Sequence, residues 1–266
     1  MDDIRNTIFK PISKQTVTAT VLVEQPGILS GCDAATAEAG NMGLSVLEKK
    51  SDRDPVQIGE RILRISGTPI LIAKAEDRLI GMMAKTSGIA TAASAFVRAA
   101  EGRARIVCGA WKKMPLEFKG MIRSALAVGG AAPRICDAPF LYLDKNYVRM
   151  FGGIAETLDS IRDLKGHQVA IQITGSCLPI EEEAVCAVKG GADLIFVDTG
   201  HVDDLIRVNH SLNTAGLRKG IRLAYAGNVS LDQIPSICQN GADIIDVGQK
   251  IVDAPLLDMH LVVDSF

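Results

Sequence analysis

The stretch GGADLIFVD at residues 190–198 is repeated as NGADIIDVG at residues 240–248. In both copies, a glycine suited to a left-handed helix end comes before a run of aliphatic residues that is typical of a buried strand. The copies finish on Asp198 and Gly248, at the carboxyl ends of the expected strands. This repeat predicts strand–helix units, and in barrels of such units the carboxyl ends of the strands carry the ligand site.

The alternation of strands and helices extends outward from the repeat and begins after Gly102. It predicts a parallel sheet that is closed, or nearly closed, into a barrel. The expected strands cover residues 104–108, 140–143, 168–174, 194–197, 221–225 and 244–247, and the expected helices cover 118–128, 154–164, 180–189, 202–212 and 230–239.

The chain before this region has a different pattern. Short strand-like stretches at 16–24, 56–59 and 61–65 surround an alanine-rich helix expected at 33–42. Two further helices are expected at 75–85 and 87–100, separated near Thr86. We therefore expect an α/β protein in which a small α+β module precedes the barrel.

Composition excludes several classes of function. Hydrophobic residues make up 47% of the chain and aromatic residues only 4%, which suits an aliphatic α/β core. A net charge of −2 provides no basic surface for nucleic acid, and no run approaches the roughly 18 apolar residues of a membrane span. The first residues, MDDIRNTIFK, lack the layout of a signal peptide, so a cytoplasmic location is expected. The six cysteines are scattered, which predicts reduced thiols rather than disulfides or a metal cluster.

The clearest phosphate signal is the segment AGNVS at residues 226–230, which follows an expected strand and precedes an expected helix. Ser230 and Gln233 have the spacing of a capping box. Free amides at such a turn can bind an anion, with Gly227 and Asn228 nearest to it. The turn at Gly248 would provide the second half of the site. The alternative is a plain strand-to-helix turn with no ligand.

Asp198 ends a strand of otherwise apolar residues. Its carboxylate could hold ribose hydroxyls or Mg²⁺, which prefers one or two carboxylates together with ligand phosphates. Alternatively, Asp198 caps the following helix. Asp193 and Asp243 begin their strands, at the opposite end, and we expect them to be structural.

Basic residues are frequent around the first barrel units. Each of them alone could be a solvated surface charge, but together they would suit the recognition of phosphate or carboxylate groups. The set comprises Arg78, Lys112, Lys113, Arg134 and Lys145.

Five motifs occur in the order found in one known family, from about Thr18 to near the C-terminus. They are EDR at 76–78 followed by SGIAT at 87–91, then VGG at 128–130, VD at 197–198 and AGNV at 226–229. With them the chain resembles the quinolinate phosphoribosyltransferase family, also called nicotinate-nucleotide pyrophosphorylase (carboxylating).

The resemblance implies the fold and assembly of a type II phosphoribosyltransferase. An N-terminal α+β open sandwich would cover residues 1–100 and an incomplete α/β barrel residues 101–253. A tail, residues 254–266, would pack back on the N-terminal domain. It also implies a homodimer, or a higher homo-oligomer, whose active site takes residues from both chains. Such enzymes transfer phosphoribose from phosphoribosyl pyrophosphate, with Mg²⁺, to a pyridine dicarboxylate that then loses CO₂.

Site roles follow from the same resemblance. Lys112, Arg134 and Asp198 would be catalytic, the two cations lining the acceptor and pyrophosphate pocket and Asp198 serving the ribose or Mg²⁺. Arg78 would reach the substrate carboxylate bound by the partner. Gly227, Asn228 and Gly248 would hold a phosphate, and the further substrate-binding candidates are Trp111, Lys113, Lys145 and Gln172.

The chain departs from the family pattern mainly on the acceptor side. Trp111 replaces an arginine, Pro133 replaces a histidine, and Ala226 replaces a serine. The stretch LDKNY at 143–147 exchanges a lysine with an acidic residue and lacks a histidine, and AIQIT at 170–174 has no carboxylate. A dianionic acceptor needs several charge-assisted donors, each contributing about 1.5–3 kcal/mol. Trp111 instead provides a flat surface for stacking a ring.

The leading hypothesis from the sequence is therefore a phosphoribosyltransferase-like enzyme with a nitrogen-heterocycle acceptor other than quinolinate. One alternative is true quinolinate phosphoribosyltransferase. Another is a non-catalytic nucleotide-binding or scaffold protein on the same fold. The last is an aldolase-type barrel with a Schiff base on Lys112 or Lys145.

Overall fold

The computed structural model describes residues 3–264, and these residues form two compact units. One unit contains residues 3–94, 114–130 and 252–264, and the other contains residues 95–113 and 131–251. The domain boundaries expected at residues 100 and 253 remain predictions. Residues 1–2 and 265–266, which belong to the predicted first domain and tail, lie outside the described residues.

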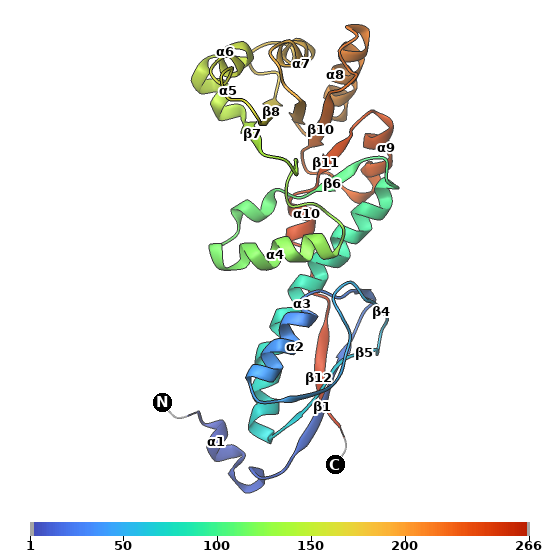
Figure 1. The fold of residues 1–266 in the computed structure, drawn as a ribbon. Coiled ribbons are helices and arrows are strands. Elements are labelled where there is room, and N and C mark those ends of the chain that lie inside the picture. The colour runs from blue at the N-terminus through green and yellow to red at the C-terminus, as the bar shows by residue number, and fades with distance from the viewer. Residues whose placement is uncertain (1–2, 265–266) are drawn as a thin grey trace. The chain divides into compact units, whose positions relative to one another are not determined.

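The first unit is built on a four-stranded sheet in the order β12-β1-β5-β3, of which β12, β1 and β5 are labelled in Figure 1. Both β12 and β5 pair with β1 in the antiparallel sense, so the last strand of the chain lies beside the first strand. A short antiparallel pair, β2 with β4, lies apart from this sheet. The elements are α1 (Arg5–Ile8), η1 (Lys10–Ile12), β1 (Val17–Val23), β2 (Gly27–Ile28), α2 (Cys32–Asn41), β3 (Ser45–Lys49), β4 (Pro55–Val56), β5 (Arg61–Gly67), α4 (Leu116–Val128) and β12 (Met259–Val263).

The expectation of two separate helices between residues 75 and 100 is wrong, because α3 (Pro69–Ala100) is continuous. Hydroxyl groups that can compete with a helix backbone are satisfied here without breaking the helix. Thr86 Oγ1 donates to Met82 O, one turn back, over 2.8 Å and to Ser30 O over 2.7 Å. Ser87 Oγ donates to Ser30 O as well, over 3.1 Å. Ser30, which is distant in sequence, therefore binds the two hydroxyl groups at the point where the helix carries Thr86 and Ser87.

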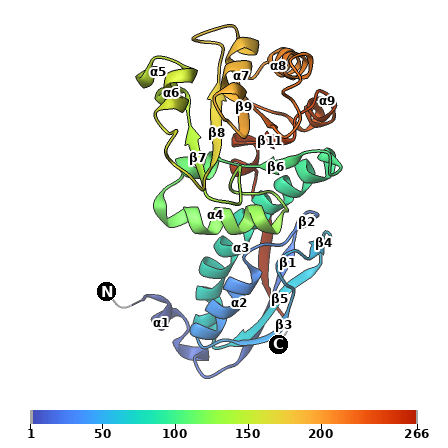
Figure 2. The same ribbon diagram turned by 45° about the horizontal axis from the view of Figure 1, so that its top comes forward.

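The second unit contains six parallel strands in the order β6-β11-β10-β9-β8-β7, which form the incomplete α/β barrel. Helices α5 to α9 lie around the outside of these strands (Figure 2). The elements are β6 (Arg105–Val107), η2 (Ala110–Lys113), β7 (Phe140–Leu143), α5 (Lys145–Phe151), α6 (Ile154–Asp159), β8 (Gln168–Ile173), α7 (Ile180–Lys189), β9 (Leu194–Asp198), α8 (Val202–Thr214), β10 (Arg222–Ala226), η3 (Leu231–Gln233), α9 (Ile234–Gln239), β11 (Ile244–Asp246) and α10 (Gln249–Val252).

Several barrel elements differ in extent from the expectation. Helix α6 ends at Asp159 instead of residue 164, and residues 230–239 form η3 followed by a short α9. Helix α5 was not expected, although Asp144 is a good N-cap: its Oδ1 accepts from the amides of Asn146 and Tyr147. In the first unit, β4 stops at Val56, so the strand expected to reach residue 59 is shorter.

The barrel interior is filled by apolar side chains from the strands, mostly small or aliphatic but including Phe196. Ala170, Phe196, Ala224 and Ile244 are buried in one cluster, together with Val107. Because this interior is apolar, the polar side chains at the carboxyl ends of the barrel strands are the candidates for chemistry in this unit.

Among the described residues, no helix combines the length and the apolar character needed to cross a membrane.

Candidate active site

Two carboxylates lie level with each other at the carboxyl ends of the strands. Ala226 of β10 pairs with Asp198 of β9 on one side and with Asp246 of β11 on the other. Register partners in a parallel sheet place their side chains on the same face. Asp198 and Asp246 therefore flank the small side chain of Ala226.

Burial raises the pKa of Asp246 above its usual value, and the charge of Asp198 raises it further. The amide of Gly109, which donates to Asp246, lowers the pKa, as do the charges of Lys112 and Lys113. Burial is the largest of these effects. The two lysines thus bring positive charge toward a strand end that holds two carboxylates.

Gln172 holds the carboxylate of Asp198 in place. The Gln172 side chain is buried, and its Nε2 donates to Asp198 Oδ2 over 2.7 Å. Its Oε1 accepts from the backbone amide of Lys145 over 2.9 Å. The alternative in which Asp198 caps α8 is wrong, because the N-cap of α8 is His201, with no side-chain cap hydrogen bond.

The turn after β6 carries one aromatic and two basic candidates. Trp111 Nε1 donates to Pro133 O over 2.7 Å, which orients the indole ring. Lys112 Nζ lies 5.4 Å from the centre of the Tyr142 ring, a cation–π contact, and Lys113 is exposed. Tyr142 packs edge-on against Phe196, with 5.8 Å between ring centres.

The remaining basic candidates differ in their surroundings. Arg134 is exposed and directly follows Pro133, the acceptor of the Trp111 hydrogen bond. Lys145 is exposed and begins α5, with its amide on Gln172. Arg78 lies in the other unit, on α3, where it is exposed and forms an ion pair with Glu38 over 3.0 Å. The structure thus gathers the barrel candidates at the strand ends.

The glycine at residue 227 is required by a close approach of two loops. Gly227 has φ +125°, and a Cβ there would lie 2.3 Å from Gly200 Cα. Asn228 adopts φ +50° and is exposed, and the capping box of Ser230 and Gln233 is present. The helices that follow are short, since η3 has three residues and α10 has four. Any anion at Gly227 or Gly248 would therefore be held by loop amides rather than by a long helix.

Two acidic residues near the strand ends were missed by the sequence reasoning. Asp246 occupies the position that Phe196 has in the first copy of the repeat. A carboxylate in place of an inward-facing apolar side chain was the signal in the sequence that could have indicated a functional residue. Glu183 lies on the buried stripe of α7 with Ile180 and Ala184. An acidic residue within a regular apolar stripe was the signal there.

Glu183 fixes the loop that follows β8. Its Oε2 accepts from the amides of Thr174 and Gly175 over 3.0 and 2.8 Å, and its Oε1 accepts from Cys177 over 2.9 Å and from Leu178 over 3.4 Å. Only 1% of Glu183 is exposed. This loop begins two residues after Gln172, so Glu183 stabilises the backbone next to the Gln172–Asp198 pair.

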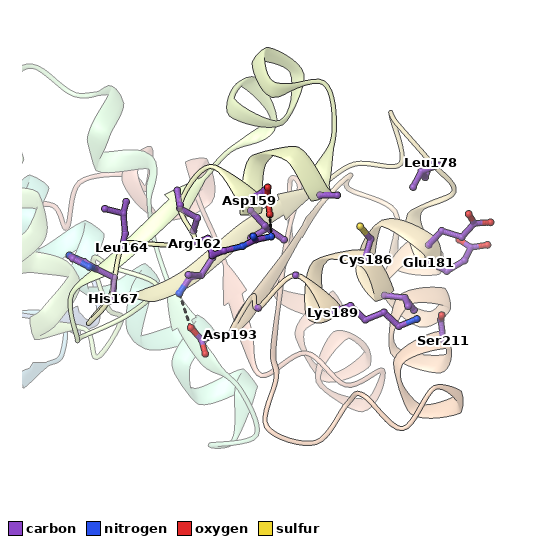
Figure 3. Close-up of a pocket in the computed structure, with 18 of the residues that line it drawn as sticks. Asp159, Arg162, Leu164, His167, Leu178, Glu181, Cys186, Lys189, Asp193 and Ser211 are labelled. Atoms are coloured by element: carbon purple, nitrogen blue, oxygen red, sulfur yellow. Dashed lines mark hydrogen bonds and ion pairs between the residues drawn. The ribbon is translucent and has the colours of Figure 1, made fainter.

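A pocket of about 980 Å³ lies elsewhere on the barrel, beside α6 and α7 (Figure 3). Its lining includes Val169 and Asp193, which lie at the amino ends of the strands. Three of its charged residues make local contacts, since Asp193 Oδ2 accepts from the Val169 amide over 2.8 Å and Arg162 pairs with Asp159. The candidate residues predicted from the sequence do not line this pocket, and we place the candidate site at the carboxyl ends of the strands.

Comparison with known proteins gives a consistent result. The family model described as "Quinolinate phosphoribosyl transferase, C-terminal domain" matches residues 89–262. A probable nicotinate-nucleotide pyrophosphorylase (carboxylating) of Methanothermobacter thermautotrophicus is 23% identical over 98% of both chains. The human nicotinate-nucleotide pyrophosphorylase (carboxylating) is 29% identical over 91% of this chain and 81% of its own length.

A similar fold occurs among solved structures. The nicotinate-nucleotide pyrophosphorylase of Francisella tularensis superposes with a TM-score of 0.79 at 21% identity, covering 98% of this chain and 94% of its own. At this level of identity the likeness shows the fold alone. Both units of this chain are included in the match.

Proposed function

Because the chain belongs to the quinolinate phosphoribosyl transferase family, we propose that it transfers phosphoribose from phosphoribosyl pyrophosphate to quinolinate, with loss of CO₂. The match of residues 89–262 to the family model carries this proposal. The leading hypothesis from the sequence, an acceptor other than quinolinate, is not supported by the comparisons. They favour the alternative of a true quinolinate phosphoribosyltransferase, since the relatives that match most of the chain are named for that activity.

The barrel residues suit a loose displacement at the anomeric carbon of the ribose. The ring nitrogen of quinolinate would form the new bond to that carbon while the bond to the pyrophosphate oxygen breaks and pyrophosphate leaves. Lys112 and Arg134, both exposed cations, would attract the acceptor carboxylates and the departing pyrophosphate. Their contribution grows when the bound substrates exclude water from these charges.

Asp198 is the proposed partner of the ribose hydroxyls or of Mg²⁺. Gln172 holds one of its oxygens, which reduces the freedom that substrate binding would otherwise have to remove. The described residues contain no cluster of three or more metal-ligating side chains. Mg²⁺ commonly binds through one or two carboxylates together with substrate phosphates, and Asp198 fits that mode. When bound, the ion would neutralise charge on the leaving pyrophosphate.

Two further proposals come from the family resemblance. Gly227, Asn228 and Gly248 would bind a phosphate of the donor through their loop amides. The active protein would be a homodimer in which Arg78 contacts the acceptor bound by the partner. Arg78 is exposed, and its ion pair with Glu38 lies at the surface, where such a pair contributes little to stability, so the arginine is available for such a role.

The test is an assay of the full chain with phosphoribosyl pyrophosphate, Mg²⁺ and quinolinate, following release of CO₂ and formation of the nicotinate nucleotide. Nicotinate and other nitrogen heterocycles serve as competing acceptors, and Asp198→Asn is the control for the site. The proposal predicts turnover with quinolinate that the variant loses. Turnover only with another heterocycle would restore the altered-acceptor hypothesis. Binding of the donor without turnover on any acceptor would favour a non-catalytic protein.

A further inference from the structure

Asp246 is joined to the turn that follows β6. Its Oδ1 accepts from the amide of Gly109 over 3.0 Å. A Cβ on Gly109 would lie 3.1 Å from Asp246 Oδ2, so the glycine backbone packs closely against the carboxylate. Asp246 and Val107 are register partners in neighbouring strands. The Asp246 carboxylate at the end of β11 thus binds Gly109, which lies just beyond the end of the neighbouring strand β6.

This contact lies at the start of the turn that carries the proposed acceptor residues. Gly109 O accepts from the amide of Lys112 over 3.2 Å, which closes the turn. The strand before the turn is anchored separately, because the Val247 amide donates to Val107 O over 2.9 Å. Beyond that point, Gly109 is bound through its amide to Asp246 and through its carbonyl to the amide of Lys112. The hydrogen bond from Gly109 to Asp246 is therefore one of the contacts that hold the start of the turn.

The turn at residues 109–113 also contacts the loop that carries Arg134. Trp111 Nε1 donates to Pro133 O over 2.7 Å, and Pro133 directly precedes Arg134. A displacement of the turn would be transmitted to this loop. Asp246 therefore contacts the turn at Gly109, and through Trp111 the same turn contacts the loop that carries Arg134.

We propose that Asp246 is a positioning residue, which fixes the turn at residues 109–113 so that Trp111 and Lys112 face the acceptor. The assignment of the turn to the acceptor rests on the proposed function, whereas the link between Asp246 and the turn does not. A carboxylate acceptor makes a stronger hydrogen bond to a backbone amide than a neutral group does. The matching position in the sequence repeat is Phe196, so the inward-facing carboxylate replaces an apolar side chain.

The single tryptophan of the chain allows a test that needs no substrate. Asp246→Ala should shift the emission of Trp111 to longer wavelength and increase its quenching by acrylamide, because the turn loses its anchor. Asp246→Asn should keep the native spectrum, since its side-chain oxygen can still accept from Gly109. The matched control is Asp243→Asn, at the opposite end of β11, where the carboxylate accepts from the Leu223 amide over 2.8 Å. This control should leave the spectrum unchanged.

Kinetics form the second arm of the test. Asp246→Ala should raise the KM for quinolinate about tenfold, the effect of one lost hydrogen bond, while the KM for the donor changes little. Asp246→Asn should restore the KM for quinolinate. Gly109→Ala, whose Cβ would press on the carboxylate, should reproduce the spectral shift even if Asp246→Ala does not fold.

Two results would overturn the inference. One is a native spectrum and a native KM in Asp246→Ala, and the other is a spectrum in Asp246→Asn as altered as that of the alanine variant. Absence of turnover in the unmodified protein would contradict the proposed function instead, and the fluorescence arm would still decide the role of Asp246.

Discussion

Gln172 Nε2 donates to Asp198 Oδ2 over 2.7 Å, between side chains from adjacent strands β8 and β9. The same glutamine accepts from the Lys145 amide beyond β7. One buried amide therefore connects the ends of three neighbouring strands. This arrangement supports a preorganised Asp198 and leads to the first prediction.

Gln172→Leu should lower the free energy of unfolding by about 1–3 kcal/mol, because the Lys145 amide and the Asp198 carboxylate each lose a partner. Chemical denaturation of the purified variant measures this change. Gln239→Leu, on the exposed face of α9, should change stability by less than about 0.5 kcal/mol. Equal stability of the two variants would mean that the Gln172 contacts contribute nothing net.

Gly227→Ala should destabilise the protein more than Gly216→Ala does. Both glycines have positive φ, so alanine is strained at either position. The cost is about 1–2 kcal/mol at Gly216, whose φ of +68° lies in the left-handed α region, and it is larger at Gly227, whose φ of +125° lies outside that region. Only at Gly227 would the new Cβ also meet backbone, 2.3 Å from Gly200 Cα, whereas the space around Gly216 is open. The difference between the two urea midpoints measures the loop contact together with the extra strain of the Gly227 φ angle, and equal midpoints would show that neither has a cost.

Glu183→Gln should lower the midpoint of thermal unfolding by several degrees. The amide that replaces one carboxylate oxygen is a donor and cannot accept from the backbone N–H groups that the oxygen binds. A buried, charge-assisted group of this kind is costly to lose. The matched control is Glu182→Gln, whose side chain is exposed and should leave the midpoint unchanged. Similar midpoints for the two variants would contradict the anchoring role of Glu183.

Arg78→Ala should raise the KM for quinolinate while changing stability by less than about 1 kcal/mol, since it removes only an exposed ion pair. Glu38→Ala removes the same pair but keeps the arginine, and it should retain the native KM. If the site is shared between protomers, mixing Arg78→Ala with Asp198→Asn should give more turnover at low quinolinate concentration than either variant gives alone. An equal KM for quinolinate in the Arg78→Ala and Glu38→Ala variants would mean that Arg78 acts through its ion pair with Glu38 and does not contact the acceptor.

The cysteines should differ sharply in reactivity. Burial raises the pKa of the Cys108 thiol to about 12, so at pH 8 it is neutral as well as inaccessible. Cys177 is exposed and should be alkylated first, as mass spectrometry of the native protein can show. Alkylation of Cys108 at a comparable rate would mean that the β6 end opens readily.

The Cys108 shift also predicts a pH dependence of stability. The usual pKa of a cysteine thiol is near 9. Between about pH 9 and 12, Cys108 therefore loses its thiol proton in the unfolded state and keeps it in the folded state. Stability should therefore fall as the pH rises through this range. Cys108→Ala should reduce that fall, and an unchanged slope would contradict the raised pKa.

Local patterns in the sequence were sufficient for much of the fold. The repeat at residues 190–198 and 240–248 and the alternation around it predicted the parallel strands and most of the helices between them. Strand β7 and helix α7 were predicted with the bounds that the structure has. Such elements are specified by the spacing of apolar residues along a single segment, so the segment alone predicts them.

Contacts between distant segments decided the remaining elements and the site. Helix α3 continues through Thr86 because Ser30 binds the hydroxyls there, and Asp198 faces Gln172 instead of capping α8. The hydrogen bond from Gly109 to Asp246 joins residues 137 positions apart. The sequence alone determined that polar residues end the barrel strands. Which of those side chains bind each other depends on strand order and register, and these are properties of the folded sheet rather than of any one strand.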